Sequence, residues 1–163
     1  MARVYLETSF VSACVTDRTD ARSVYRHGTS LEWWQKQRSS HEVFVSSEVL
    51  AELGVPGHRG RAEALELIRG VPQLEVSDEV VGFAGVLVSE LAMPRPAAAG
   101  DALHVAVATL HGMDYVLTWN VRHLANPNKI EHLRKVCFRF GRLPPTIVTP
   151  EFLWEASDDP TSE

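Results

Sequence analysis

The sequence predicts an α/β protein with a central, mostly parallel sheet and helices on both of its faces. Short apolar segments rich in β-branched residues alternate along the chain with longer segments of helical periodicity. That alternation is typical of parallel strands joined by right-handed helical crossovers. The length of 163 residues suits one domain, which buries roughly 70% of the surface that its unfolded chain exposes.

The first half of the chain has clear local signals for helix ends. Thr8 or Ser9 is expected to cap the first helix, and Ser46 or Ser47 the third, because short hydroxyl side chains accept from the free N–H groups of a first turn. Gly70 is expected to end the fourth helix. In this half the expected strands are 4–6 and 42–47, and the expected helices are 10–17, 19–40 (as one helix or two short ones), 47–53 and 61–70.

The second half continues the same alternation. Pro94 stops an apolar helix, Gly112 ends an alanine-rich one, and Thr149 precedes Pro150 as a capping motif. We expect one domain over residues 1–155 and a polar tail over 156–163. In this half the expected strands are 73–77, 115–120 and 145–150, and the expected helices are 78–93, 97–112 and 130–142.

Composition narrows the class of protein. Hydrophobic residues make up 45% and charged residues 23%, as in soluble globular proteins. The net charge of −5 argues against a general basic surface for nucleic acid, but a metal site could still act on nucleic acid. Cys14 and Cys137 lie in apolar segments without CxxC spacing and are expected to be reduced core residues. With no signal-peptide pattern and no long apolar span, we expect a cytoplasmic protein.

Four polar side chains occur where the pattern expects apolar residues or turns: Glu7, Glu52, Asp101 and Asn120. Glu7 and Asn120 end strands, so both belong to the carboxyl edge of the sheet, where sites form. Two carboxylates about 4 Å apart repel by roughly 4 kcal/mol at an effective dielectric constant of about 20. A cluster therefore needs a proton, with a raised pKa, or a divalent cation. Oxygen ligands suit Mg²⁺ or Mn²⁺, which activate water and stabilise phosphoryl charge.

Alternatives stay open for several of these residues. Asp101 alone would complement a helix dipole. Glu48 shares a helix face with Glu52 and is read as a solvated first-turn acid. His104 lies one turn after Asp101 and either touches substrate or is a hydrogen-bonded core residue. His123 either contacts phosphate or has a structural role as a helix-capping or loop residue.

Four blocks in this order resemble the PIN domain family, and most closely its compact VapC-type toxins: "YLETS", "SSEVLAEL", "GDALHVAVATLHGMDYVLTWN" and "RHLAN". The resemblance begins near residue 3 and ends with "VTPEFL" at 148–153, so it covers nearly the whole chain. It implies a three-layer α/β/α sandwich, a ribonuclease that depends on Mg²⁺ or Mn²⁺, an RNA substrate and a cognate antitoxin that blocks the site. It also implies a homodimer, for which the tryptophans at 33 and 34 are a possible surface.

The resemblance assigns roles residue by residue. Glu7, Glu52 and Asp101 would hold the metal, Asn120 would complete the site, and Thr8 or Ser9 would contact water or phosphate. His104 and His123 are further candidate contacts. The chain departs from the family at two positions, because Glu7 replaces the usual aspartate and Asn120 stands where a fourth acid is common. These departures favour two rivals: a catalytically degenerate binding module, and a nuclease acting on another phosphate substrate such as DNA flaps.

Overall fold

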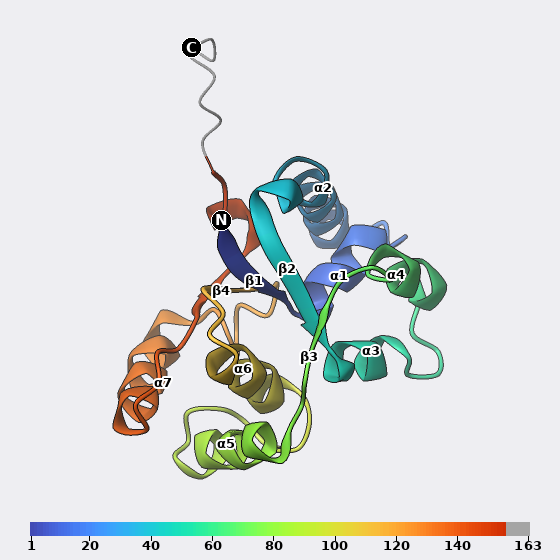
Figure 1. Ribbon diagram of the computed structural model, residues 1–163. Helices are drawn as coiled ribbons and strands as arrows, with labels where there is room; N and C mark the ends of the chain where they lie inside the picture. The colour runs from blue at the N-terminus through green and yellow to red at the C-terminus, as the bar shows by residue number, and fades with distance from the viewer. Residues whose placement is uncertain (156–163) are drawn as a thin grey trace.

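A computed structural model of the protein describes residues 1–155 and shows a five-stranded sheet whose pairings are all parallel. The strand order is β3-β2-β1-β4-β5, so the chain moves outward from β1 in one direction and then returns to its other side (Figure 1). The order therefore reverses between β1 and β4, and α/β proteins bind ligands beyond the carboxyl ends of strands at such a point. The strands are β1 (Ala2–Leu6), β2 (His41–Ser46), β3 (Gln73–Leu74), β4 (Tyr115–Leu117) and β5 (Thr146–Val148).

Helices cover both faces of the sheet and make a three-layer α/β/α sandwich (Figure 1). The crossovers on the β1-to-β3 side place α1 to α4 on one face, and those leading to β4 and β5 place α5 to α7 on the other. The predicted fold class is confirmed. The helices are α1 (Thr8–Val15), α2 (Ala21–Lys36), α3 (Ser47–Leu53), α4 (Arg61–Leu67), α5 (Asp78–Ser89), α6 (Asp101–Leu110) and α7 (Pro127–Arg139), with short 3-10 helices η1 (Arg38–Ser40) and η2 (Pro150–Phe152).

Helix α6 shows why the segment after Asp101 is rich in small apolar residues. Every residue from 102 to 109 is buried, and the helix packs against α5 and next to β4. Alanine and valine let neighbouring elements approach closely on all sides of a buried helix. The start of α6, at Asp101, is thereby held firmly at the carboxyl edge of the sheet.

Other core predictions also meet the structure. Cys14 and Cys137 are buried free thiols, as expected. Trp33 is buried, and its indole N–H donates to the carbonyl of Leu153 at 2.7 Å. That tryptophan belongs to the core and offers no surface to a dimer. Within residues 1–155, no helix is both long and apolar enough to cross a lipid bilayer.

Several boundaries differ from the sequence-based expectation. Helix α6 begins at Asp101 rather than at 97, because Gly100 takes φ 71° and ψ −146°, which is incompatible with a helix. Helix α4 ends at Leu67, before Gly70, and α5 ends at Ser89. Strand β3 has two residues, and β4 ends three residues before Asn120. The predicted tail over 156–163 lies outside the described residues.

The predicted capping motif before Pro150 is half correct. Pro150 does begin the 3-10 helix η2, as a ring with a fixed φ allows. Thr149 occupies the cap position, but its side chain makes no capping hydrogen bond. Its hydroxyl is buried and has no partner among residues 1–155.

Candidate active site at the carboxyl edge of the sheet

Glu7 follows β1 at the point where the strand order reverses, and its carboxylate lies 5% exposed. Its Oε2 atom accepts hydrogen bonds from the backbone N–H of Ser9 at 3.0 Å, from the Ser9 hydroxyl and from the hydroxyl of Thr118 at 2.7 Å. Glu7 is thus the N-cap of α1, and the expectation that Thr8 or Ser9 caps this helix is wrong. A carboxylate in this position also complements the helix dipole. The Oε1 atom makes no hydrogen bond to the described residues.

Glu52 is held by two neighbours on its Oε1 atom. The hydroxyl of Thr8 donates to it at 3.1 Å, and Nε2 of His104 forms a second, short hydrogen bond. His104 is fully buried, and its Nδ1 lies 2.6 Å from the hydroxyl of Tyr5, which in turn lies 2.7 Å from Oγ of Ser46. A continuous buried chain of polar groups therefore runs from β2 through β1 and α6 to the carboxylate of Glu52.

This chain bears on two expectations about hydroxyl and histidine side chains. Ser46 is the N-cap residue of α3, but its side chain makes no capping bond because it pairs with Tyr5. His104 is fully buried with a hydrogen bond at each ring nitrogen, so it fits the expected core residue and not the alternative of a substrate contact. It is a positioning residue for Glu52.

Burial and charge act in opposite directions on this chain. Burial by itself would raise the pKa of Glu52, but the hydrogen bond from His104 and the adjacent charge leave it below its usual value. Burial likewise would lower the pKa of His104, but the bond to Glu52 and the charge of Glu7 leave it raised. Burial raises the pKa of Tyr5 well above its ordinary range, so its hydroxyl stays protonated. Glu52 is therefore not an acid whose pKa is raised by the cluster.

Asp101 and Asn120 meet across the same edge. The side-chain amide of Asn120 donates to Oδ1 of Asp101 at 3.1 Å, and the backbone N–H of Asn120 donates to the Thr118 hydroxyl at 2.9 Å. Since Thr118 also donates to Glu7, a connected set of hydrogen bonds links Glu7 to Asp101. The backbone N–H of His123 donates to the side-chain oxygen Oδ1 of Asn120 at 3.1 Å, so the loop that follows Asn120 orients its amide.

Glu48 is a functional neighbour that sequence reasoning misplaced. Its Oε1 accepts from the backbone N–H of Gly100 at 3.0 Å, so it is not merely solvated. The bond joins α3 to the residue just before Asp101. Thr118 was also missed. Its only signal was a hydroxyl directly after the apolar core of β4.

The three acids share a feature that bears on metal binding. Each has one carboxylate oxygen bonded by the protein and one oxygen with no partner among the described residues. Carboxylate and amide oxygens are the donors that Mg²⁺ and Mn²⁺ prefer. Within residues 1–155, no group of three His, Cys, Asp or Glu side chains lies close enough to hold a metal ion together. Mg²⁺ usually binds through one or two carboxylates with several waters, so the donor chemistry fits such an ion.

Comparison with solved structures supports the same class of fold. VapBC2 from Rickettsia felis, bound to a DNA fragment from its promoter, matches with a TM-score of 0.53 and 15% identity over 94% of this chain and 99% of that chain. The Mycobacterium tuberculosis toxin VapC20, which cleaves the sarcin-ricin loop, matches with a TM-score of 0.55 and 24% identity over 73% and 91%. FitAcB from Neisseria gonorrhoeae matches with a TM-score of 0.55 and 14% identity over 92% and 99%.

These likenesses define the fold of the chain. No protein-family model matches the sequence, and no curated protein matches it in sequence. The parallel sheet with its reversal between β1 and β4, flanked by helices on both faces, is the fold that the VapC structures share with this protein. The chain has the fold of a VapC-like PIN domain.

Proposed function

We propose that the protein is a divalent-metal-dependent endoribonuclease and the toxin of a toxin–antitoxin pair. The observation that carries the proposal is the position and bonding of Glu7, Glu52 and Asp101. They belong to one connected edge of the sheet, at the reversal of strand order, and each leaves one oxygen unbonded.

The residues have separate tasks in this proposal. Glu7, Glu52 and Asp101 would hold Mg²⁺ or Mn²⁺ with their unbonded oxygens, one or two of them directly and the rest through bound water, because the three do not lie close enough to bind one ion together. The ion would supply an activated water and stabilise charge on phosphate. His104 keeps Glu52 charged and oriented. Asn120 orients Asp101 with its amide and adds no charge of its own.

The antitoxin completes the proposal. VapBC2 and FitAcB, two of the similar structures, carry the names of paired systems. We expect a small open reading frame beside the gene, whose product binds this chain and stops RNA cleavage. A homodimer also stays a prediction. Its surface would have to exclude the buried Trp33.

Cleavage assays test the proposal directly. The full chain is incubated with single-stranded RNA in Mg²⁺, Mn²⁺ or EDTA, beside the variants Asp101→Asn and Asp78→Asn. Asp78 is an exposed acid at the start of α5 and makes no side-chain hydrogen bond within residues 1–155, so it is the matched control. We expect cleavage only with a metal ion, its loss in Asp101→Asn and its retention in Asp78→Asn. Absence of cleavage with either ion, with RNA still bound, would establish a binding module instead.

A further inference from the structure

A cavity of about 450 Å³ lies beside the acidic site, between α1, the start of α2 and the loop from α3 to α4. Its wall carries three arginines and a histidine, from different segments of the chain: Arg18, Arg26, Arg59 and His58. Hydroxyl side chains of α1, including Ser9 and Ser12, line the same space. The size is within the usual range for a small-ligand site.

The charge of this cavity is opposite to that of the chain as a whole, whose net charge is −5. Arg59 is neutralised by an ion pair with Asp17, whose Oδ2 lies 3.0 Å from Nη2 of the arginine. Arg18 and Arg26 form no ion pair within residues 1–155, although several acids of the chain do pair with other arginines. Asp20, the nearest other acid in sequence, caps α2 by accepting from the N–H of Ser23 at 3.1 Å. Hydrogen bonds from Ser23 lower the pKa of Asp20, and the charge of Arg18 also helps to lower it, but neither Arg18 nor Arg26 is in a direct ion pair within the described residues. The cavity therefore still presents positive charge to an anionic ligand.

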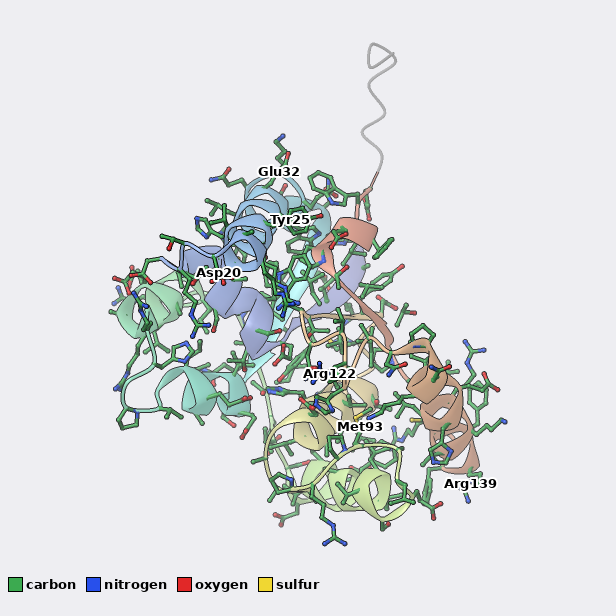
Figure 2. All side chains as sticks on the ribbon, turned by 180° about the vertical axis from the view of Figure 1, so that it is seen from behind. Asp20, Tyr25, Glu32, Met93, Arg122 and Arg139 are labelled. Atoms are coloured by element: carbon green, nitrogen blue, oxygen red, sulfur yellow. The ribbon has the colours of Figure 1, made fainter. Side chains whose placement is uncertain are left out.

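Trp119 and Arg26 line the cavity, and the exposed Tyr25 contacts this tryptophan without lining the cavity itself. The guanidinium carbon of Arg26 lies 5.2 Å from the ring centroid of Trp119, which is only 5% exposed. Tyr25 contacts the same tryptophan edge-on, with centroids 6.3 Å apart, and is 57% exposed. Figure 2 shows Tyr25 on α2, on the same side of the molecule as Asp20 and away from Arg139 on α7. Tyrosine rings and guanidinium planes both stack on bases.

The cavity is continuous with the acidic site through one side chain. Ser9 lines the cavity, and its hydroxyl donates to Glu7 and accepts from the backbone N–H of Trp119 at 2.9 Å. A ligand bound in the cavity would therefore lie next to the carboxylate of Glu7. A chain with regularly spaced anionic groups and planar rings would satisfy both the arginines and the exposed tyrosine.

We propose that this cavity binds the phosphate and base of a nucleotide adjoining the cleaved phosphodiester of a single-stranded RNA. The inference rests on the proposed ribonuclease function and names how that site holds its substrate. Arg18 and Arg26 bind phosphate, and Tyr25 stacks on the base. A chain of acidic residues alone, such as polyglutamate, fits less well, because it supplies the charge but no flat ring for Tyr25.

A binding assay without cleavage tests the proposal. A fluorescein-labelled single-stranded 2′-O-methyl RNA is titrated with the full chain in EDTA, and anisotropy is followed over a range of salt concentrations. Variants are Arg18→Gln, Arg26→Gln, their combination, and Tyr25→Ala. The control is Arg134→Gln, an exposed and unpaired arginine, as far as residues 1–155 show, on the distant helix α7 (Figure 1). Circular dichroism melting checks the folding of each variant. Arg18 is exposed to solvent, and its side chain makes no hydrogen bond to the described residues. Of the variants, Arg18→Gln is therefore expected to disturb folding least.

Removal of each arginine should reduce the magnitude of the negative slope of log affinity against log salt by about 0.7, and removal of both should reduce it by about 1.4. The combined variant should bind about tenfold more weakly at low salt, and Tyr25→Ala at least about fivefold more weakly. Arg134→Gln should match the wild type. Absence of RNA binding by the wild type, equal loss in the control, an unchanged combined variant, or equally tight binding of polyglutamate would overturn the proposal.

The two proposals fail in different ways. If the wild type binds RNA through these arginines but never cleaves it with Mg²⁺ or Mn²⁺, only the ribonuclease proposal fails. If the combined variant cleaves RNA with the KM and salt dependence of the wild type, only the cavity proposal fails.

Discussion

Replacing Tyr5 by phenylalanine removes one hydroxyl from the buried chain that positions Glu52. That hydroxyl lies 2.7 Å from Oγ of Ser46 and 2.6 Å from Nδ1 of His104, and all three residues are fully buried. A typical hydrogen bond contributes about 1 kcal/mol net, and a buried group left without a partner costs about 1–3 kcal/mol. We expect the free energy of unfolding to fall by about 2 kcal/mol. In a chain of 163 residues this corresponds to a decrease of about 4–8 °C in Tm.

A double-mutant cycle identifies the cause of the loss. Ser46→Ala removes one of the two partners of the Tyr5 hydroxyl, which still has His104 as its other partner. We therefore expect the free energy of unfolding to fall by a smaller amount, about 1 kcal/mol. In the double variant, no serine hydroxyl is left unpaired. Its loss should be less than the sum of the single losses by about 1 kcal/mol, in the range for residues in one network.

Urea denaturation followed by circular dichroism measures these values, provided that the m-value is unchanged. Tyr115→Phe is the matched control, because the hydroxyl of Tyr115 makes no hydrogen bond to the described residues and its loss should cost less than about 0.5 kcal/mol. If Tyr5→Phe is as stable as that control, or if the losses of Tyr5→Phe and Ser46→Ala add without coupling, the hydrogen bonds of Tyr5 do not stabilise the fold as argued.

Four further outcomes follow from particular residues. Gly100→Ala should lower the free energy of unfolding by about 1–3 kcal/mol, because φ is 71° at this position. Gly82→Ala, within α5 and at ordinary φ, is the control and should not destabilise the protein. Equal melting temperatures of the two variants would refute this prediction. His41 is buried against Trp33 and burial lowers its pKa, so protonation of the unfolded chain should reduce stability as pH falls below about 6.5. That loss should be smaller in His41→Phe, and parallel stability curves between about pH 7 and about pH 5 would contradict it. Burial raises the pKa of Cys14 to about 12 and that of Cys137 to about 11, so a thiol reagent at neutral pH should label neither until the protein unfolds. Mn²⁺ at a hundredfold excess over Kd should stabilise the fold by about 2.7 kcal/mol in the wild type and not in Asp101→Asn, as scanning calorimetry would show.

The fold could be predicted because its signals are local and repeat along the chain. Alternating strands and helices specify parallel crossovers, whichever strand neighbours which. The shortness of β3 and the start of α6 could not be read in this way. They depend on which neighbour pairs with Gln73 and on the backbone angle of Gly100, which the alanine-rich pattern before Asp101 conceals.

The candidate site could be predicted in outline, because acids and amides are unusual at strand ends. Its supporting residues could not. Tyr5 resembles an ordinary core residue of an apolar strand, and its role comes from a hydroxyl that meets His104, 99 positions away. Glu48 and Glu52 share a helix face, so spacing alone does not tell which one holds Gly100 and which one meets His104.

The bonding of each acid explains how three carboxylates can share one edge of the sheet. Glu7 receives the N-terminal N–H of a helix and two hydroxyls, Glu52 receives a buried histidine, and Asp101 receives an amide. Each carboxylate therefore has its own source of positive potential, and the pKa of Glu52 is lowered rather than raised.

The bonding of Glu7 bears on the replacement of the family's usual aspartate. One of its oxygens caps α1 while the other remains unbonded. Aspartate is itself a preferred N-cap residue, so the cap alone does not require the longer side chain. An aspartate would have a shorter reach by one bond of about 1.5 Å. Glu7 therefore contributes to the stability of the helix and keeps one oxygen unbonded, which the proposed function would use for the cation, so the glutamate does not by itself indicate a lost activity.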